Sequence, residues 1–584
     1  TTDATKRVYE VKFVYNGEVK ATRYATNGQS IHGGMPTFTA KDLLGTGYNP
    51  HHYYAIAFEG GFNASTPVNA DRKVDITLAE KDCYEIASKE NWKEFCVLVN
   101  GGQTKLNAKM TANVDLGSDI TMVGTNAHNY SGTFDGQGYT LKLNWDSGSN
   151  GYIAPFSVVE GATIRNLRTE GNIKSSYSHL SGLILTVFGK TTITNCVSDV
   201  NITSSKKSGS CAIAGMALSI TYGAVVTFTD CIVKGKYNTT LKEGSIVSGF
   251  VTDHSGTSTF NNCIYLGDNV PGGGYTFAAY TYLGPTLNNC YYLNACGVAQ
   301  GTKITEEQLK SGEVTKKLQG DRTDACYWAQ VLGKTPSPYS EADKAKPNYV
   351  YYNKENNGWT CDDFRLTDGQ SLPIGLDFTA TKATYDRTLA AGKATLCLPY
   401  ELPVQGFKAY TLADRQESRT AVHFKEVNGT LGAYRPYLLV ADAPARLDGE
   451  NLQVKADRSS IVLSAGNYYF KGAVHDVVNW WLTSDHAYIL QADGLFHKVT
   501  SNNPSVTVPA YRAYISYNSH EGAKPLSIVF DGETTGIYGT TDGATDGAVY
   551  NLQGQRVADR LDDSVRRQIP TGVYIVNGRK VIVK

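Results

Sequence analysis

Hydrophobic and polar positions alternate along this chain over short runs, and turn-forming residues separate the runs. Val, Ile, Thr and Tyr dominate the runs, whereas Gly, Asn, Asp and Ser lie between them. A period of two residues is typical of half-buried β-strands. The segment Val8–Tyr15 alternates up to Asn16-Gly17 and the pattern resumes at Val19, as in a two-residue β-hairpin. We predict a mainly β protein in which residues 1–80 form a small N-terminal β domain.

A five-residue phrase recurs in the middle of the chain. Its copies read TIRNL at 163–167, TITNC at 192–196, TFTDC at 227–231, TFNNC at 259–263 and TLNNC at 286–290. The Asn or Asp of one copy lies 29, 35, 32 and 27 residues before that of the next. This is the period of architectures that stack one structural repeat on another.

The polar position of the phrase is predicted to be a bend. The hydrophobic residues that flank it are three apart, and a regular strand would point them to opposite faces. A bend lets both side chains point inward, so the copies would form a structural ladder of Asn166, Asn195, Cys196, Asp230, Cys231, Asn262, Cys263, Asn289 and Cys290. We predict a parallel β-helix over residues 81–300, right-handed by the usual rule for parallel crossovers.

The cysteines of the phrase are expected to be small buried side chains. Parallel strands lie about 4.8 Å apart, so stacked thiols form a line, whereas zinc needs four ligands around one point at about 2.3 Å. Disulfides between neighbouring copies are also unfavourable, because the Cβ atoms would be too far apart. We expect mostly free thiols among the 11 cysteines, no metal and no cofactor.

Helical spacing flanks the repeats. In residues 82–102 the hydrophobic positions predict a helix that covers the first end of the repeats, with one face formed by Ile86, Trp92, Phe95, Cys96 and Val99. In residues 305–321 a capping box at Thr305 and Gln308 predicts one helix that closes the far end. Residues 301–349 would therefore hold this closing helix and a linker at 333–347.

The remainder of the chain returns to strands. Runs of strand length at regular spacing predict one or two antiparallel β-sandwich domains at 350–537. A Gly-, Thr- and Asp-rich loop precedes a last unit at 538–584, where Asn577-Gly578 would join two strands as a hairpin.

Several of these segments resemble a known group of proteins. GTFDGQGYTLKL at 132–143, with ATIRNLRTEGNI and TTITNCVSDVNI after it, is similar to the GLUG-type β-helix repeats of secreted and surface proteins from Bacteroidetes. The end of the chain resembles the C-terminal sorting domains read by the type IX secretion system, through a sorting motif of Gly554, Pro570, Gly572, Tyr574 and Lys584. The resemblance implies a secreted or cell-surface location and contact with secretion machinery.

Charge and hydropathy narrow the classes of partner. Lysine plus arginine equals aspartate plus glutamate, 55 against 55, which gives no general attraction to nucleic acid or anionic membranes. No apolar run approaches the roughly 18 residues that cross a bilayer, and the first residues lack a signal-peptide core. We expect no nucleic-acid partner, no membrane span and a soluble chain that could be a processed mature form.

Candidate chemistry is sparse. Parallel β-helices can be carbohydrate-active enzymes, but the acidic residues of the repeats share no common position: Asp135, Glu170, Asp199, Asp230 and Asp268. Asp230 alone occupies a fixed place in the phrase, and there a turn role is favoured. Polar loops between repeats could bind a ligand or simply be solvated. Possible ligand-binding residues are Tyr177, His179, Lys206 and Lys207 in those loops, and Trp480 and Trp481, although at least one tryptophan is expected in a core.

Three classes of function therefore stay open. The first is a non-catalytic, adhesin-like surface protein that recognises a glycan or a host or matrix protein. The second is a polysaccharide lyase or glycoside hydrolase with catalytic residues in the repeat loops. A purely structural spacer is a third possibility.

Overall fold

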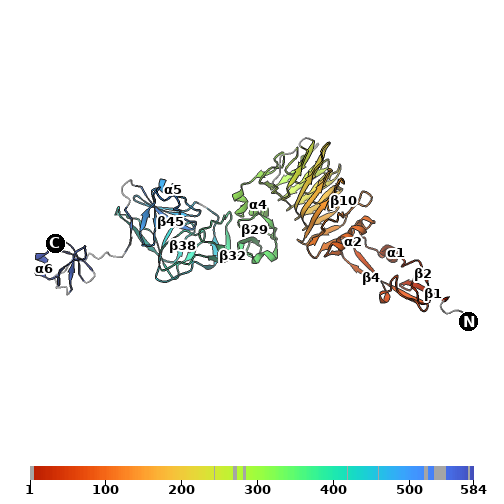
Figure 1. The fold of residues 1–584 in the computed structure, drawn as a ribbon, viewed down its shortest axis with the longest axis horizontal. Coiled ribbons are helices and arrows are strands. Elements are labelled where there is room, and N and C mark those ends of the chain that lie inside the picture. Colours follow the sequence, from red (N-terminus) through yellow and green to blue (C-terminus); the bar gives the residue numbers. More distant parts are fainter. Residues whose placement is uncertain are drawn as a thin grey trace. The chain divides into compact units, whose positions relative to one another are not determined.

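The computed structural model describes residues 6–241, 244–267, 273–279, 284–416, 418–457, 459–518, 524–531, 547–576 and 579–583. The protein is mainly β, with 45% of residues in strands and 10% in helices. Contacts divide the chain into two compact units (Figure 1), which are Thr1–Gln330 with Lys334–Glu341, and Val331–Gly333 with Ala342–Lys584. Among the described residues, no helix combines the length and the apolar character that a membrane span requires.

The first unit begins with a four-stranded sheet in the order β2-β1-β4-β3. Its strands are β1 Val8–Tyr15, β2 Glu18–Thr26, β3 Tyr53–Phe58 and β4 Arg72–Lys81, with the short helix α1 Ala40–Leu44 between β2 and β3. Asn16 and Gly17 join β1 to β2 with φ of 48° and 83°. Positive φ at both turn residues suits a type I′ hairpin, and the predicted hairpin is confirmed.

The copies of the five-residue phrase pair with one another in register. Thr163 pairs with Thr192, Thr192 with Thr227, Thr227 with Thr259 and Thr259 with Thr286, all in parallel. Figure 1 shows the resulting stack of strands. They form one sheet in the order β26 Thr286–Asn288, β24 Thr257–Asn261, β19 Val225–Thr229, β15 Lys190–Thr194, β11 Thr163–Arg165, β8 Thr133–Asp135, β6 Ala108–Met110 and β5 Tyr84–Ile86.

Three more parallel sheets accompany this one. The runs that follow the phrase form the order β28 Thr302–Lys303, β27 Tyr291–Tyr292, β25 Ile264–Tyr265, β20 Ile232–Val233, β16 Val197–Ser204, β12 Arg168–Ser175, β9 Thr140–Asp146 and β7 Val114–Asp115. The other two sheets are β10 Phe156–Glu160, β14 Ile184–Phe188, β18 Ala217–Ile220 and β23 Val251–His254, and β13 Leu180–Ser181, β17 Cys211–Ala214 and β22 Ser245–Ser248. Their inward side chains share one continuous core.

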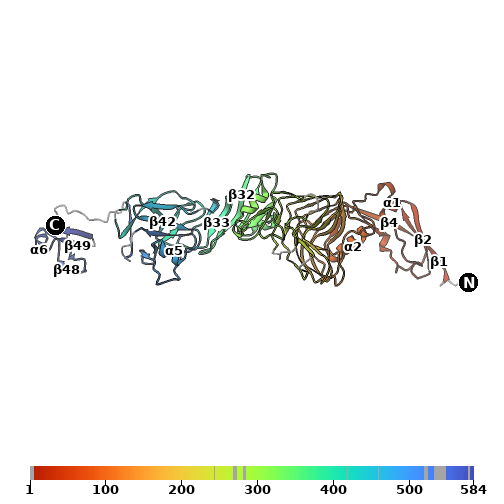
Figure 2. The same cartoon turned by 90° about the horizontal axis from the view of Figure 1, so that it is seen from above.

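The first predicted helix is shorter than the sequence pattern indicated. Helix α2 covers Lys89–Asn100, begins at the N-cap Ser88 and buries Trp92, Phe95, Cys96 and Val99. Ile86 lies in β5 instead. The ring of Trp92 contacts those of Phe134 and Phe156 edge to face, so α2 packs against the first strands of the stack (Figure 2).

The second predicted helix is two helices, and they do not close the end of the stack. Helix α3 spans Glu306–Lys310 with the predicted capping box at Thr305, and α4 spans Glu313–Gln319 after Gly312, whose φ is 87°. Their apolar residues pack on the side of the stack, against a row of outward-facing partners: Val197, Ile232, Ile264 and Tyr291. Those residues directly follow the ladder cysteines and need a cover, which the two helices supply.

The predicted linker at 333–347 has local structure. It contains β30 Ser337–Pro338, which pairs with β29 Trp328–Val331, and a 3₁₀ turn at Glu341–Ala345. An ion pair joins Lys346 to Asp343 at 2.8 Å. The composition that suggested a linker is that of a surface segment with turns.

The second unit contains three larger sheets. The first sheet includes β31 Tyr349–Asn353, β32 Gly358–Leu366, β33 Phe378–Tyr385 and β40 Gly449–Val454. The second, which we call the middle sheet, has the order β34 Gly392–Leu396, β39 Tyr437–Ala441, β36 Lys408–Leu412, β37 Ala421–Val427 and β46 Ser527–Phe530. The third has the order β41 Val462–Ala465, β42 Tyr468–Ala473, β45 Arg512–Tyr517, β43 Ala487–Leu490 and β44 Phe496–Lys498. Leu439 and Leu438 point from the middle sheet into different cores, so that sheet is covered on both faces.

Strand direction in this unit differs in two places from the antiparallel prediction. β32 pairs with β33 in parallel, and so does β37 with β46. Alternation of side chains along a strand is the same in both arrangements, which is why the sequence pattern did not distinguish them.

The last described segment has its own core. Strands β47 Val549–Tyr550, β48 Arg556–Ala558, β49 Gly572–Val576 and β50 Arg579–Val583 form a small antiparallel sheet, and helix α6 Asp563–Gln568 was not anticipated. Val549, Leu561, Tyr574 and Val581 are buried together. Asn577 and Gly578, the predicted hairpin turn, lie outside the described residues.

Candidate functional site

The polar residues of the phrase adopt left-handed backbone conformations. Asn166, Asn195, Asp230, Asn262 and Asn289 have φ between 52° and 55°. Asn and Asp tolerate this region better than other residues with a Cβ atom. The bend that the sequence predicts is therefore present at every copy.

Side-chain amides connect some of these bends. Asn195 Nδ2 donates to Asn166 Oδ1 at 2.8 Å, and Asn289 Nδ2 donates to Asn262 Oδ1 at the same distance. Asn195 Oδ1, by contrast, is buried and has no hydrogen-bond partner among the described residues. The cause is that the next copy carries Asp230, and a carboxylate has no proton to donate.

The thiols behind the bends are buried and repeat one contact. Sγ of Cys196, Cys231, Cys263 and Cys290 lies 3.3 to 3.4 Å from the carbonyl oxygen two residues earlier. Burial raises the pKa of the Cys196 and Cys263 thiols well above the ordinary value. Within the part of the chain that the structure describes, no three His, Cys, Asp or Glu side chains gather as metal ligands would.

Asp230 has a role that its place in the phrase did not indicate. Arg322 binds both carboxylate oxygens of Asp230 at 2.8 Å, and the indole Nε1 of Trp328 donates to Oδ1 at 2.7 Å. Arg322 also lies over the ring of Tyr327. Asp230 therefore fixes the segment that follows α4 to the side of the stack, and the prediction of a simple turn role was incomplete.

One concave surface of the repeats follows the corner between two sheets, and we call it the corner groove. Its floor is a row of neighbouring positions on β10, β14, β18 and β23, which are Ser157, Leu185, Leu218 and Thr252. Leu185 and Leu218 join Ala154 and Ala214 in a small apolar cluster separate from the main core. Four strands about 4.8 Å apart make this floor roughly 14 Å long.

Polar and aromatic residues form the two walls of the corner groove. On one wall Thr186, Ser219 and Asp253 are register partners, and Ser219 Oγ donates to Asp253 Oδ2 at 2.8 Å. The other wall includes His179, and the ring of Tyr152 stacks on the His179 ring at 4.5 Å and an angle of 12°. Beyond them lie Ala212 and Ile246. A hollow of about 550 Å³ lies between the walls and includes His179, Leu218 and Asp253 in its lining.

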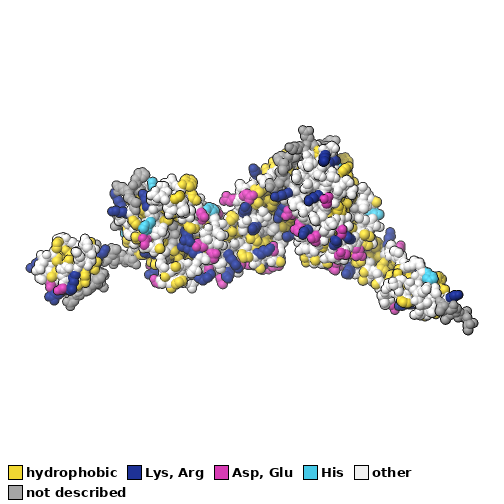
Figure 3. All heavy atoms as spheres, viewed as in Figure 1, with side chains coloured by type: hydrophobic (Ala, Val, Ile, Leu, Met, Phe, Trp, Pro, Cys, Tyr) yellow, Lys and Arg dark blue, Asp and Glu magenta, His cyan; other side chains and the backbone are white. Residues whose placement is uncertain are grey.

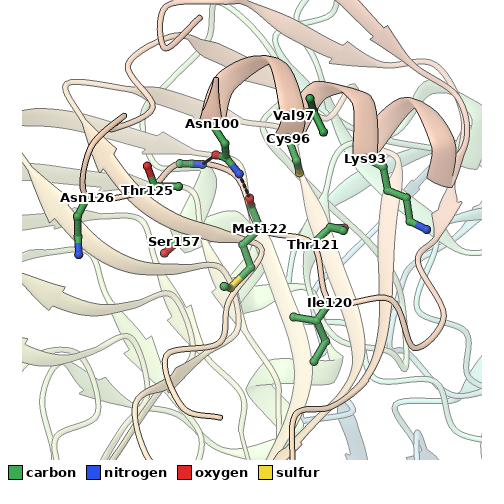
Figure 4. A pocket seen from close by; sticks show the side chains of 11 residues that line it. Lys93, Cys96, Val97, Asn100, Ile120, Thr121, Met122, Thr125, Asn126 and Ser157 are labelled. Carbon is green, nitrogen blue, oxygen red and sulfur yellow. Dashed lines mark hydrogen bonds between the residues drawn. The ribbon is translucent and has the colours of Figure 1, made fainter. Parts of the chain in front are cut away.

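A second hollow continues the floor toward α2. It has a volume of about 910 Å³ and is lined by Ser157, Met122 and the exposed side of α2 (Figure 4). Asn100 at the end of α2 donates from Nδ2 to the Met122 carbonyl at 3.0 Å and accepts from the Gly124 amide at 2.8 Å. Met122 also packs against the apolar cluster of the floor, and Ser157 belongs both to the floor and to the lining of this hollow.

A short chain of hydrogen bonds connects Lys206, Ser178 and His179. The ammonium of Lys206 donates to Ser178 Oγ at 3.2 Å, and Ser178 Oγ lies 2.7 Å from His179 Nδ1. Lys206 can only donate, whereas the Ser178 hydroxyl can donate to Nδ1 of His179 or accept from it. Burial and the nearby Lys206 lower the pKa of His179 below 6.5. Both effects favour the uncharged ring.

Two aromatic residues at this wall have strained backbones. Tyr152 and His179 have φ of 64° and 72°. A left-handed conformation costs about 1 to 2 kcal/mol for a residue with a Cβ atom, and such outliers concentrate at functional sites. Tyr152 is nevertheless 54% exposed, so the strained conformation holds an aromatic ring at the surface.

The structure brings together three of the four loop residues suggested by the sequence. Lys206 Nζ lies 4.6 Å from the centre of the Tyr177 ring, and both residues adjoin His179 through Ser178. Lys207 is exposed, and the described contacts among Tyr177, Ser178, His179 and Lys206 do not include it. Tyr152, Ser219 and Asp253 were missed, because they come from different repeats and share no sequence motif.

The tryptophans differ from the prediction. Trp480 and Trp481 lie on a short helix, α5 Asn479–Ser484, and are 68% and 53% exposed. The expectation that alternation along a strand would bury one of them is therefore wrong. Tyr488 and Phe496, by contrast, are in the core. The two indoles meet edge to face, at 87°.

The described residues of the predicted sorting motif have local structural roles. Tyr574 is buried, and its hydroxyl donates to the Pro570 carbonyl at 2.8 Å. Gly572 lies beneath the Tyr574 ring, and Gly554 has a φ of 80° in the preceding turn. Lys584 and Asp268 lie outside the described residues.

No family model matches the chain, and no curated protein matches it.

Proposed function

We propose that this chain is a non-catalytic, adhesin-like binding protein that holds a linear glycan in the corner groove. The strained, exposed Tyr152 stacked on His179 carries the proposal. Aromatic faces suit the apolar faces of sugar rings, and strain at an exposed aromatic residue is better explained by ligand contact than by stability.

The remaining groups of the corner groove complement a glycan. The floor combines the apolar Leu185 and Leu218 with the hydroxyl-bearing Ser157 and Thr252, while a ring nitrogen of His179 and the carboxylate of Asp253 can form hydrogen bonds with sugar hydroxyls. Ligand sites commonly combine an apolar lining with a few oriented polar groups. Asp253 is the carboxylate that lines the hollow among the described residues.

The architecture in the proposal is a right-handed parallel β-helix over residues 81–300. Its support is the in-register pairing of successive phrase copies and the shared core of the parallel sheets. The right hand follows from the general preference of parallel crossovers. Such a scaffold would present a regular groove to a regular polymer.

The proposal also includes the location of the protein in or outside the cell. The GLUG-like repeats and the sorting motif support a secreted or cell-surface protein that secretion machinery recognises through its C-terminal segment. The support is the sequence resemblance together with the separate core of residues 547–583.

The test is binding to a panel of plant, microbial and host polysaccharides, with mass spectrometry of any fragments. We expect binding without fragments. Tyr152→Asn, which keeps a residue that tolerates positive φ, should weaken binding about tenfold, or about 1.4 kcal/mol. The matched control Tyr24→Asn removes a similarly exposed ring, 53% exposed, from β2 and should have no effect.

The other outcomes are equally informative. Release of defined oligosaccharides would replace this proposal with the carbohydrate-active enzyme. Binding to a host or matrix protein but to no glycan would keep an adhesin and remove the glycan. Equal binding by wild type and Tyr152→Asn would remove the corner groove from the account.

A further inference from the structure

A basic pocket in the second unit is independent of the corner groove. Its volume is about 320 Å³, and its lining includes Arg387, Lys393 and Arg512 without any carboxylate. Lys393 lies on β34, Arg512 begins β45, and Arg387 lies in the loop between β33 and β34. Segments that are distant in the sequence therefore bring three positive charges together in one pocket.

The carboxylate of Asp368 pairs with one of these three cations, and its single negative charge compensates only part of their positive charge. Arg512 binds Asp368 through Nη2 at 2.8 and 3.0 Å, and Tyr385 also donates to Asp368. Arg387 donates to the Thr395 carbonyl at 2.9 Å. Within the described residues neither Arg387 nor Lys393 forms an ion pair, and the one carboxylate whose charge acts on Arg387 is Asp368, which Arg512 already binds.

The two arginines lie in an electrostatically unfavourable environment. Burial and the neighbouring Arg512 lower the pKa of Arg387. Nε of Arg512 is buried and has no hydrogen-bond partner among the described residues. Tyr511, directly before Arg512, has a φ of 67°, a strained conformation that places the arginine.

The rest of the lining is apolar. Ile489 and Leu490 from β43 and Val508 and Pro509 from the segment before β45 supply it. A free inorganic ion would leave this wall unused, whereas a small organic anion would contact both parts. A volume near 300 Å³ is the lower end for ligand pockets.

We propose that this pocket binds a small organic anion, an acidic sugar residue whose carboxylate or sulfate meets Arg387, Lys393 and Arg512 and whose ring lies on the apolar wall. Guanidinium groups suit such oxyanions because of their forked donors. The inference goes beyond the function proposed for the corner groove, because it concerns the other compact unit.

The experiment is calorimetric titration of the full chain with sodium glucuronate, with glucose as the neutral match and sodium sulfate as competitor. We expect glucuronate to bind at least about tenfold more tightly than glucose, which is the order of one charge-assisted hydrogen bond. Sulfate should compete, and added salt should weaken binding.

Variants locate the site. Lys393→Met changes an exposed side chain and should weaken glucuronate binding about tenfold, while Lys408→Met on β36 should not change it. Arg387→Met should have a larger effect if it folds, and Lys393→Met decides the case if it does not. Equal affinity for glucose and glucuronate, sulfate binding without glucuronate binding, or an unchanged Lys393→Met would overturn the proposal.

Discussion

At the scale of single residues, the aspartate at position 230 forms contacts with Arg322 and Trp328 in place of the amide hydrogen bond that an asparagine could form there. As an Asn, it could donate to Asn195 Oδ1, which now lacks a partner. As an Asp, it binds Arg322 and Trp328. The hydrogen bond would contribute about 1 kcal/mol, whereas loss of a buried ion-pair partner costs about 3 kcal/mol or more.

Asp230→Asn should therefore lower the free energy of unfolding by about 2 kcal/mol, as measured by urea denaturation. Lys310→Ala, which removes an exposed pair with Glu306, is the control and should change it by less than about 1 kcal/mol. A more stable Asp230→Asn protein would show that the amide ladder outweighs the contact with Arg322.

His179 predicts a pH dependence whose sign follows from its lowered pKa. The folded state resists protonation through burial and Lys206, while Asp253 opposes this shift. The unfolded state therefore binds a proton first as the pH falls below about 6.5, and stability decreases from there toward the folded pKa. This contribution is absent above that range.

The measurement is unfolding of wild type and His179→Asn between pH 7.5 and 5, with an NMR titration of the ring. Asn tolerates the positive φ, and the variant should lose less stability than wild type on acidification. An NMR pKa at or above 6.5, or identical pH slopes, would contradict the assignment of a neutral His179.

At the scale of elements, α3 and α4 act as a lateral cover. Leu309, Val314 and Leu318 are buried against the outward row that begins at Val197. The sequence signal for this was present, because each ladder cysteine is followed by an apolar residue. The expectation of an end cap followed chain order alone, and chain order does not tell which face of a stack a helix covers.

Leu318→Ala should lower the free energy of unfolding by about 2 to 5 kcal/mol through a cavity beneath α4, measured by urea denaturation. Hydrogen exchange should increase at 306–328 and stay low in β11 and β15, which belong to the main core. Uniform loss of protection across all repeats would show that the helices support the entire stack.

At the scale of the whole molecule, the repeats could be predicted from the sequence, whereas the corner groove could not. The phrase identifies its own register, because similar residues occupy equivalent positions in every copy. The floor row of Ser157, Leu185, Leu218 and Thr252 has no common residue type, so only strand pairing brings it together. The same holds for the basic pocket, whose three cations come from separate segments.

The choice between helix and strand was the other feature that the sequence pattern did not predict. The segment around Trp480 and Trp481 carries residues that favour strands, yet it forms α5. Tertiary contacts decided this, since Leu482 of that helix is buried in a local core.

The most direct test of the account is hydroxyl-radical footprinting of the chain with the glycan that the panel identifies. Aromatic side chains react in proportion to their exposure, so each ring reports on its own contact with the ligand. The account predicts protection of Tyr152, Tyr177 and His179, with Trp480 and Trp481 unchanged. Protection of the tryptophans alone, or no protection along the corner groove, would contradict it.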